Sequence, residues 1–406
     1  MRHTKLPSLV VMGVALSGLV VGCSEIKDEK EPTVQEEVQE NETTEKDEII
    51  EDDGEAMIKV NSNLSKNIKI LDLAYKNENI MISPTSLNVA LGMVTNGAGG
   101  ETLKELEDFL GCSIDEYNQF VKSYTEHPEE GVNVVNAVWV ANNYNLKEEY
   151  CKLLVDYYNA TQEKLDFSDP KSIDKINEWV DKNTDGRFKK VLSDVPADTR
   201  TILTNVVDFD KKWKEPFEEF QIEEGKFNNE KNVTYLSDMT RCSYYENEYA
   251  TGFARDYEGD RYSFIGILPK QEGEFSVSDL DIESLLRNET YEKVDYKFPE
   301  FEFEFESTLN SYLKQLGINN AFGNNADFSN LLEETEGYRI DSVMQKTKVI
   351  VNREGTKASA ATTIVVGTNS VVQEEIKEIY LDRPFVFIIY DNETEECLFI
   401  GKVVNP

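Results

Sequence analysis

Few side chains in this sequence could perform acid–base or nucleophilic catalysis. The 406 residues include only two histidines, His3 and His127, and His3 lies in an N-terminal segment that we expect to be removed. A Ser/His/Asp site or a histidine-rich metal site needs a histidine beside its partner residues. We therefore expect no catalytic residues, no metal site and no cofactor. A hydrolase is disfavoured, because it would have to depend on His127.

The cysteines indicate lipid attachment rather than a disulfide framework. Residues 1–22 carry Arg2 and Lys5 ahead of an apolar stretch, which is the layout of a signal peptide. The stretch ends at Val20-Val21-Gly22-Cys23, which resembles a bacterial lipobox. That resemblance implies cleavage before Cys23 and lipidation of its sulfur, so the mature chain would be anchored outside the cytoplasm, to the bacterial cell membrane or the cell surface. The other four cysteines are widely spaced without a CxxC pair and predict no bridge.

Acidic residues dominate the composition. Lys and Arg number 42 against 78 Asp and Glu, a formal net charge of −36, which disfavours binding to nucleic acid. Residues 24–55 hold 15 Asp and Glu against three Lys, with only two Val and three Ile, so they cannot bury a core. We predict a disordered acidic tether over residues 23–57. No Pro/Gly/Ser-rich linker divides residues 58–406, which predicts one large domain.

One segment near the C-terminus combines a strand pattern with features of a protease substrate. From Thr356 to Gly367 the side chains alternate between two faces. The first face is small to medium and mostly apolar: Thr356, Ala358, Ala360, Thr362, Ile364 and Val366. The second is mostly small or polar: Lys357, Ser359, Ala361, Thr363, Val365 and Gly367. The polar stretch 367–370 then offers a protease an extended substrate. The segment could be an ordinary strand of a sheet, or a potential strand that leads to a cleavage site.

Helical and strand patterns are both present around this segment. Ser83 and Pro84 predict a helix start, and apolar residues at helical spacing continue to Gly97. Two more helices are predicted, one ending at Gly111 and one following Ser172. Short β-branched or alternating runs predict strands at 132–140, 201–209, 262–269, 301–306, 347–352, 385–390 and 397–404. The predicted fold class is α+β.

Four ordered motifs resemble those of the serpin family. They are Asn79-Ile80-Met81-Ile82-Ser83-Pro84-Thr85-Ser86, Asn205 followed by Trp213-Lys214-Glu215-Pro216-Phe217, the segment 353–380 itself, and Asp382-Arg383-Pro384-Phe385-Val386-Phe387 continuing to Gly401-Lys402-Val403-Val404-Asn405-Pro406. Asn136-Ala137, Asp166-Phe167 and residues 177–186 fall in order between them. The resemblance covers roughly residues 58–406.

Membership of that family implies a fold with three β-sheets, eight or nine helices and an exposed reactive-centre loop. It also implies an inhibitor of proteases rather than an enzyme. The target protease attacks the loop as a substrate and forms an acyl-enzyme. The freed segment then inserts into the main sheet as a new strand and carries the covalently bound protease with it. The non-inhibitory alternative is a binding protein on the same fold.

The resemblance assigns roles to particular residues. The hinge that enters the sheet consists of Gly355, Thr356, Lys357, Ala358, Ser359, Ala360 and Ala361. Its small residues and the absence of proline favour an inhibitory loop. The shutter beneath the sheet consists of Ser83, Ser86, Asn205 and Gln345, and Trp213 marks where the inserting strand begins. In two departures, Arg353 stands where the family commonly has glutamate, and Gln345 where many members have histidine. We expect Gln345 to hydrogen-bond with Ser83, Ser86 and Asn205.

The position of the reactive bond depends on how the loop is counted. The usual spacing from Gly355 predicts cleavage between Asn369 and Ser370, whereas counting back from Pro384 places the specificity residue near Gln373. Other candidates are Val366, Thr368, Val371 and Val372. Because this neighbourhood is small and aliphatic, we expect an elastase-like or subtilisin-like serine protease, or a papain-like cysteine protease, as the target.

The remaining expectations concern partners. Arg187 with Lys189 and Lys190, and Lys211 with Lys212 and Lys214, form only small basic groups in an acidic domain, so a heparin-type cofactor is disfavoured. The family resemblance implies a monomer.

Overall fold

The structure is a computed structural model that describes residues 63–196, 198–333, 337–356 and 375–406. These residues all belong to one compact unit, Glu55–Pro406. No helix in these ranges is long and apolar enough to cross a membrane.

Eight α-helices and three short 3-10 helices lie in the described ranges. The α-helices are α1 (Leu64–Ala74), α2 (Pro84–Thr95), α3 (Gly100–Leu110), α4 (Ile114–Glu126), α5 (Glu148–Tyr158), α6 (Lys171–Asn183), α7 (Ile282–Arg287) and α8 (Asn310–Gln315); the 3-10 helices are η1 (Glu219–Gln221), η2 (Val277–Leu280) and η3 (Asn320–Phe322).

Local sequence signals explain where several helices begin and end. Ser83 caps α2, since its Oγ accepts a hydrogen bond from the N–H of Ser86 at 3.1 Å. Gly111 ends α3 in the left-handed conformation. Both boundaries match the prediction. α6 begins two residues earlier than predicted, at Lys171, and its N-cap position is occupied by Pro170 rather than Ser172.

Fourteen strands are described, and the predicted runs are among them. The strands are β1 (Ile80–Ile82), β2 (Val132–Ala141), β3 (Thr161–Leu165), β4 (Thr201–Phe209), β5 (Ile222–Phe227), β6 (Lys231–Glu246), β7 (Ala250–Asp256), β8 (Tyr262–Pro269), β9 (Glu289–Pro299), β10 (Phe301–Thr308), β11 (Met344–Val351), β12 (Lys377–Tyr380), β13 (Phe385–Asp391) and β14 (Glu396–Val403). β11 begins three residues before the predicted run.

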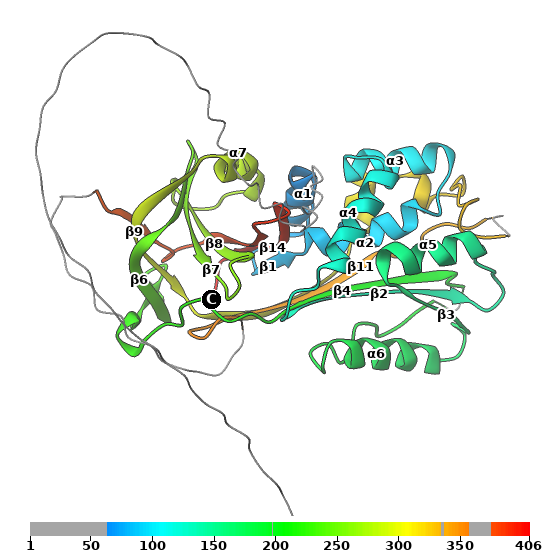
Figure 1. Cartoon of the computed structure of the whole chain (residues 1–406), viewed down its shortest axis with the longest axis horizontal. Helices are drawn as coiled ribbons and strands as arrows, with labels where there is room; N and C mark the ends of the chain where they lie inside the picture. Colours follow the sequence, from blue (N-terminus) through cyan, green and yellow to red (C-terminus); the bar gives the residue numbers. More distant parts are fainter. Residues whose placement is uncertain (1–62, 197, 334–336, 357–374) are drawn as a thin grey trace, which may run out of the picture. The chain divides into compact units, whose positions relative to one another are not determined.

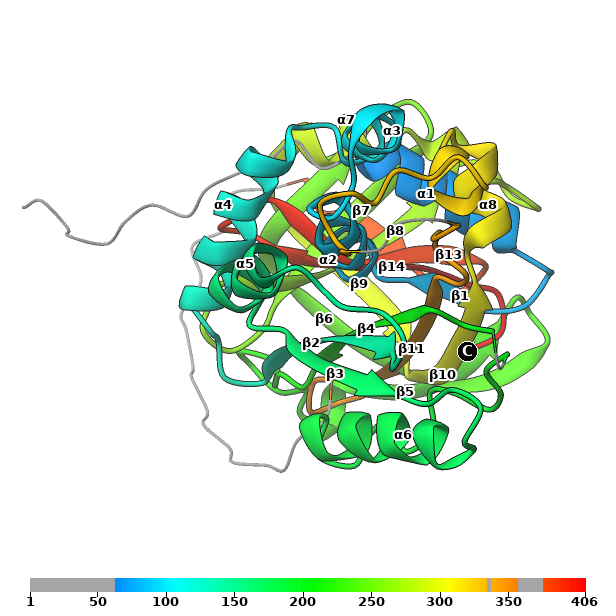
Figure 2. The same ribbon diagram turned by 90° about the vertical axis from the view of Figure 1, so that its right-hand side faces the viewer.

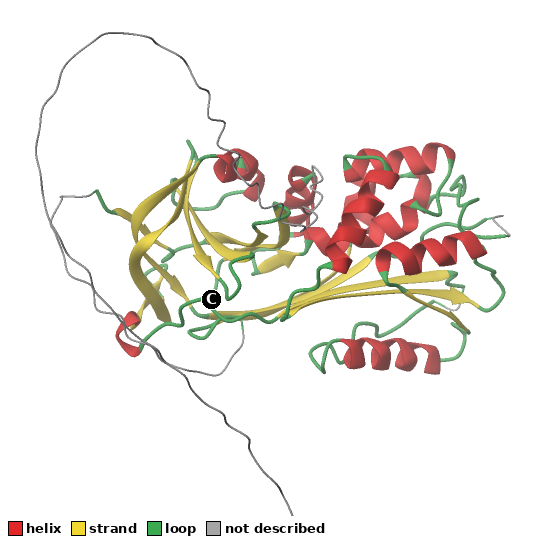
Figure 3. Ribbon diagram, viewed as in Figure 1, coloured by secondary structure: helices red, strands yellow, loops and turns green. Residues whose placement is uncertain are grey.

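The five strands that bear on function form one layer. They fall into two hydrogen-bonded groups, β3-β2-β4 and β10-β11. Figure 2 shows β2, β4 and β11 side by side. α2, α4 and α5 cover one face of this layer, and α6 covers the other (Figures 1 and 3). Side chains on the two faces of these strands therefore meet different surroundings.

The other nine strands form a bent sheet in the order β1-β14-β13-β8-β7-β6-β9-β12, with β5 paired to β6. The long strand β6 belongs to both parts, because its first residues pair with β5 and its last residues pair with β7. One part of the bent sheet contains β5, β9, β12 and the start of β6, and the other contains the end of β6 with β7, β8, β13, β14 and β1. Together with the five-strand layer, these two parts make three sheets, and the described ranges contain eight α-helices. The expected α+β fold with three sheets and eight or nine helices is confirmed.

The core is rich in aromatic side chains where the bent sheet meets the five-strand layer, at the end where β4 and β11 finish. Phe209 and Val349, from β4 and β11, pack there with Trp213, Phe264 and Phe298. The four cysteines in the described ranges are free thiols, which agrees with the expectation of no bridge.

Candidate functional site

A seam divides the five-strand layer between β4 and β11. In the described residues no hydrogen-bonded ladder joins the two strands. They run in the same direction, because their first residues, Thr201 and Met344, line one cavity of about 140 Å³, while Phe209 and Ile350 near their far ends line another of about 500 Å³. A chain that returned along the seam would therefore be antiparallel to both strands. Backbone groups at such an edge are available to pair with an added strand.

The chain turns back directly after β11, at the end of the seam where β4 and β11 finish. Asn352 and Gly355 exchange two backbone hydrogen bonds of 3.1 and 3.3 Å. On its other side, Gly355 forms an antiparallel bridge with Lys212, just beyond β4. The N–H of Thr356 donates to the carbonyl of Lys211 at 2.8 Å, and only 4% of Thr356 is exposed. Residues 355 and 356 thus already lie between the ends of the two strands.

Only glycine fits at position 355. Its φ is 139°, a backbone conformation that other residues rarely adopt. A Cβ atom there would lie 2.4 Å from the carbonyl oxygen of Lys211 and 2.6 Å from the Cα of Lys212. Both the turn and the close approach of the two chains therefore require a residue without a side chain.

Trp213 holds this turn from the side of β4. Its N–H donates to the carbonyl of Glu354 at 3.2 Å, and its indole Nε1 donates to the carbonyl of Asn352 at 2.8 Å. The indole stacks on Tyr257 with ring centroids 4.5 Å apart. The Tyr257 hydroxyl lies 3.0 Å from Thr356 Oγ1, and burial raises the pKa of Tyr257, so this hydroxyl stays neutral. The predicted hinge residues Gly355 and Thr356 and the predicted Trp213 therefore lie together.

Arg353, one of the two departures from the family pattern, has an acidic neighbour. Its guanidinium lies 3.6 Å from Glu300 and 3.6 Å from Glu219, and its backbone N–H donates to Glu300 Oε1 at 3.0 Å. The side chains of Arg353 and Glu300 are 43% and 28% exposed. Solvent screening keeps such a pair weak, at about 1 kcal/mol or less. Glu300 nevertheless ties the start of the turn to the segment between β9 and β10.

The predicted shutter residues lie beneath the seam, but their hydrogen bonds differ from the expectation. Gln345 is buried and makes both of its bonds to the backbone of Ser83: Oε1 accepts from the N–H at 3.0 Å, and Nε2 donates to the carbonyl at 2.8 Å. Ser86 bonds to Ser83 rather than to Gln345. The expected bond from Gln345 to Asn205 is wrong, because the Asn205 amide donates to Asn136 Oδ1 on the neighbouring strand β2.

Asn205 leaves an unused acceptor beside the seam. Its Oδ1 is buried and has no hydrogen-bond partner in the described part of the chain. Asn205 and Gln345 line the same cavity from opposite sides of the seam. An unpaired buried acceptor costs about 1–3 kcal/mol, so a donor brought into the seam would be stabilised there.

Sequence reasoning missed Arg255, which supports the Trp213 segment from below. It lies on β7, its guanidinium is 3.8 Å from the centre of the Phe217 ring, and it donates to Asp238 at 3.1 Å and to Tyr296. Burial alone would lower the pKa of Arg255, but Tyr296 and Asp238 together outweigh it and raise the pKa. A single arginine in an otherwise ordinary strand gives no sequence signal of this role.

Lys211, which forms a small basic group with Lys212 and Lys214 in the sequence, is buried. Only 6% of its side chain is exposed, and its Nζ lies 2.7 Å from Glu129 Oε1. Tyr262 lies beside it. Lys211 therefore connects the hinge, through its carbonyl group, to the loop that follows α4.

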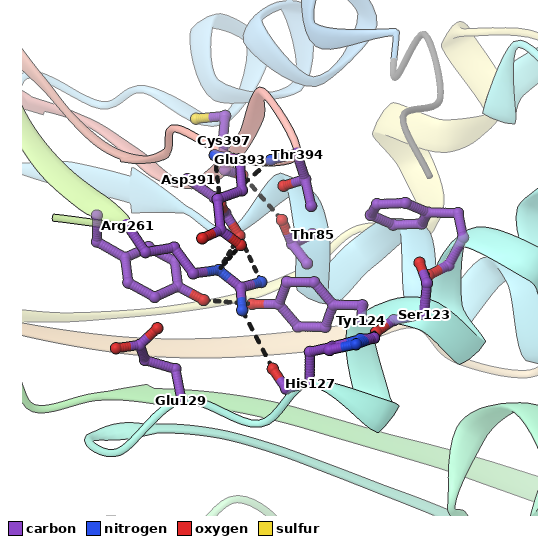
Figure 4. A network of polar contacts seen from close by, with 12 residues as sticks. Thr85, Ser123, Tyr124, His127, Glu129, Arg261, Asp391, Glu393, Thr394 and Cys397 are labelled. Atoms are coloured by element: carbon purple, nitrogen blue, oxygen red, sulfur yellow. Dashed lines mark hydrogen bonds and ion pairs between the residues drawn. The ribbon is translucent and has the colours of Figure 1, made fainter. Parts of the chain in front are cut away.

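Figure 4 shows the polar network beyond that loop. Arg261 donates to Asp391 at 2.8 and 3.0 Å, and to the carbonyl of His127 at 3.1 Å, and its guanidinium lies near the ring of Tyr124. The His127 ring is bonded to the carbonyl of Ser123 within the same helix end. His127 is therefore part of the structural end of α4 and is not paired with a nucleophile.

Several predicted site residues lie outside the described ranges. They are Cys23 and, in the loop, Lys357, Ala358, Ser359, Ala360, Ala361, Val366, Thr368, Asn369, Ser370, Val371, Val372 and Gln373. The described chain ends at Thr356 and resumes at Glu375, just before β12.

Comparison with known proteins identifies the family. The serpin (serine protease inhibitor) family model matches residues 59–406. An uncharacterised serpin-like protein of Thermococcus kodakarensis is 32% identical over 354 residues, covering 82% of each chain. Serine protease inhibitor 42Dd of Drosophila melanogaster is 28% identical, covering 83% of this chain and 94% of its own.

Solved structures agree with the sequence comparison. The native state of tengpin, a thermophilic serpin, superposes with a TM-score of 0.76 at 31% identity, covering 84% of this chain and 92% of its own. The latent state of the same protein gives 0.71. The seam, the hinge turn and these matches lead to one conclusion: the chain belongs to the serpin family, whose members are protease inhibitors rather than enzymes.

Proposed function

We propose that the protein is an inhibitory serpin that traps its target protease as a covalent acyl complex. The target cleaves the reactive loop, and the segment after Thr356 then inserts into the seam between β4 and β11. The observation that carries this proposal is the pair of bridges made by Gly355, one with Asn352 and one with Lys212. These bridges form the first step of an added strand.

The two bridges also set the register of the inserted strand. Continued pairing from Asn352 would place Ala358 beside Val349, Ala360 beside Thr347 and Thr362 beside Gln345. Continued pairing from Lys212 would place the same three residues beside Phe209, Val207 and Asn205.

The registers from Asn352 and from Lys212 agree on which face of the inserted strand would point into the core. Val349 and Phe209 belong to one buried cluster, and so does Val207. The small, mostly apolar face that begins at Thr356 would therefore be buried on insertion. In this register Thr362 would lie between Asn205 and Gln345, where its hydroxyl could donate to the unused Asn205 Oδ1.

The opposite face of the inserted strand, which carries Lys357 and Ser359, would point toward α6, and its side chains would fit the polar surroundings there. Lys357 would lie between Asp210 and Ile350, and Ser359 beside Lys348. Lys348 is already paired with Glu302 and Glu304, and its side chain is 28% exposed. The cavity of about 500 Å³ on this side offers space for the Lys357 side chain.

We place the reactive bond between Asn369 and Ser370, with Val366, Thr368, Val371, Val372 and Gln373 as neighbouring candidates. The small aliphatic neighbourhood favours an elastase-like or subtilisin-like serine protease; a papain-like cysteine protease is the other class that fits. No cofactor is required, because the protease supplies the catalytic groups.

The test is to mix the protein with an elastase and with a subtilisin, and to analyse the products by denaturing electrophoresis. We expect a complex that survives boiling in detergent, with an ester bond between the protease and the new C-terminal residue of the inhibitor. Mass spectrometry of the released C-terminal peptide then identifies the cleaved bond. Cleavage by both proteases without any covalent complex would contradict the proposal and favour the non-inhibitory binding protein.

We further propose that the protein acts as a monomer on the outer side of a bacterial membrane. Cys23 would carry the lipid, after removal of residues 1–22, and the acidic residues 23–57 would separate the inhibitor from the membrane. The variant Cys23→Ser is expected to be released into the medium, whereas the unchanged chain partitions with membranes and incorporates labelled fatty acid. Equal partitioning of both forms would contradict the anchor.

A further inference from the structure

An exposed aromatic side chain, flanked in the sequence by glutamates, lies just before β5. Phe220, in the 3-10 helix η1, is 85% exposed. The ten residues 215–224 contain five glutamates and no basic residue. The five are Glu215, Glu218, Glu219, Glu223 and Glu224. We call Phe220 with these glutamates the acidic patch.

The acidic patch is held rigidly from both ends. The backbone N–H of Glu218 donates to Gln221 Oε1 at 2.9 Å, and the two side chains cap the short helix reciprocally. The Gln221 carbonyl accepts from Ser237 Oγ at 3.0 Å, which fastens η1 to β6. Phe217, just before η1, is buried against Arg255. Phe220 therefore remains exposed although its backbone is anchored.

The patch lies beside the point where the reactive loop leaves the body. The N–H of Phe217 donates to the carbonyl of Arg353 at 3.1 Å, and the Arg353 guanidinium lies 3.6 Å from Glu219. Arg353 precedes the hinge glycine by two residues. The residues that lead into the reactive loop therefore lie beside η1, which carries Phe220.

The charge of the patch restricts which partner would fit. The side chains of Glu219 and Glu223 are 93% and 52% exposed, and Arg353 and Lys297 each neutralise one glutamate only in part. A fixed negative field attracts a cationic surface and raises its association rate. An exposed phenyl ring can fill an apolar recess and stabilise the complex once formed.

We infer that the acidic patch is a second contact site for the target protease, and that it selects proteases with a basic, partly apolar rim around the substrate cleft. This inference rests on the proposed function, because the protease is the partner that the loop brings to this place. It adds a specificity determinant that lies outside the loop sequence.

The experiment compares association rates with a subtilisin of basic isoelectric point, before and after succinylation of its lysines. Phe220→Ala is expected to lower the association rate about tenfold. The triple variant Glu215→Gln, Glu223→Gln and Glu224→Gln should lower it similarly and flatten its dependence on salt; Glu219 is left intact because it contacts Arg353. Succinylation should abolish the advantage of the unchanged chain over the triple variant.

Two matched controls test whether removing any exposed aromatic ring or carboxylate lowers the association rate, or only removing those of the acidic patch. Tyr291→Ala removes another exposed aromatic, 66% exposed on β9, and Glu272→Gln with Glu274→Gln removes two exposed carboxylates in the loop after β8. Neither control should change the association rate. Rates that are unchanged in the patch variants, or lowered equally in the controls, would overturn the inference.

Binding to a catalytically inactive subtilisin distinguishes failure of this inference from failure of the proposed function. If the unchanged chain forms no covalent complex, weaker binding of the patch variants to the inactive protease would still support the patch, and equal binding would overturn it. Self-association of the unchanged chain that Phe220→Ala removes would assign the patch to a second copy and also overturn the inference.

Discussion

At the residue scale, the hinge depends on one glycine and on the backbone groups that surround it. Gly355 lies where two chains approach so closely that the carbonyl of Lys211 occupies the place of a side chain. Thr356 follows with its N–H bonded and its hydroxyl beside Tyr257. If the proposed insertion occurs, its first two residues already lie between the ends of β4 and β11.

The variant Gly355→Ala should be destabilised by about 2–4 kcal/mol, because a Cβ combines an unfavourable φ with a clash against backbone atoms. Urea unfolding measures the change. Gly273→Ala is the control: its φ is 106°, but no atom lies within 4 Å of the added Cβ, so only the conformational cost of about 1 kcal/mol remains. Equal costs for the two variants would show that the close approach at Gly355 is unimportant.

Arg353 shows how a departure from a family pattern can be accommodated. Its charge is opposite to the glutamate that is common there, and the structure supplies Glu300 and Glu219 as partners. Arg353 and Glu300 are 53 residues apart in the chain. The arginine therefore has two acidic partners beside the predicted hinge.

At the element scale, the important feature is the seam between β4 and β11. The registers set by Asn352 and by Lys212 agree on which face of an inserted strand is buried. Because the two registers agree, adjacent loop residues would point to opposite faces of the inserted strand. The effects of the same substitution at two adjacent positions can therefore be compared.

Ala358→Glu is expected to convert the inhibitor largely into a substrate, because a carboxylate would be buried beside Phe209 and Val349. The stoichiometry of inhibition should rise several-fold, with more cleaved inhibitor and less complex. Ser359→Glu is the matched control, since its carboxylate would face Lys348 on the α6 side and should leave the stoichiometry nearly unchanged. The reverse order of effects would show that the register is wrong.

At the scale of the whole molecule, the proposed insertion would release free energy, because it would add hydrogen bonds and bury apolar side chains. Each ladder hydrogen bond contributes about 0.5–1.5 kcal/mol, and insertion would add bonds to both neighbouring strands. It would also bury Ile364 and Val366. The aromatic cluster that β4 and β11 both border would then be covered by a continuous sheet.

Cleavage of the loop should therefore raise the Tm by about 10 °C or more. Since 1 kcal/mol shifts the Tm of a domain of about 350 residues by roughly 1–2 °C, this rise requires about ten ladder hydrogen bonds on the two sides of the inserted strand. Differential scanning calorimetry before and after cleavage measures this change. The variant Ala358→Glu, once cleaved, should show a smaller rise. An unchanged Tm after cleavage of the unaltered loop would indicate that no strand is inserted.

Several features could be predicted from sequence because they depend on neighbouring residues. The cap at Ser83 and the stop at Gly111 depend on local geometry, and both are confirmed. The alternating faces of the segment from Thr356 onward stay a prediction, because residues 357–374 lie outside the described ranges. The ordered motifs were sufficient to predict the family and its fold, and the comparisons confirm both. The scarcity of histidine also agrees with a family of inhibitors rather than enzymes.

Only the tertiary structure decided how distant segments meet. It joined Asn205 to Asn136 rather than to Gln345, gave Arg353 its partner Glu300, and buried Lys211 beside Glu129. The physical reason is that hydrogen bonds and ion pairs between strands depend on sheet order and register, which no local spacing specifies. The sequence by itself determined the family and the fold and predicted a small-residue strand for insertion, and the tertiary structure decided where the seam lies and which residues border it.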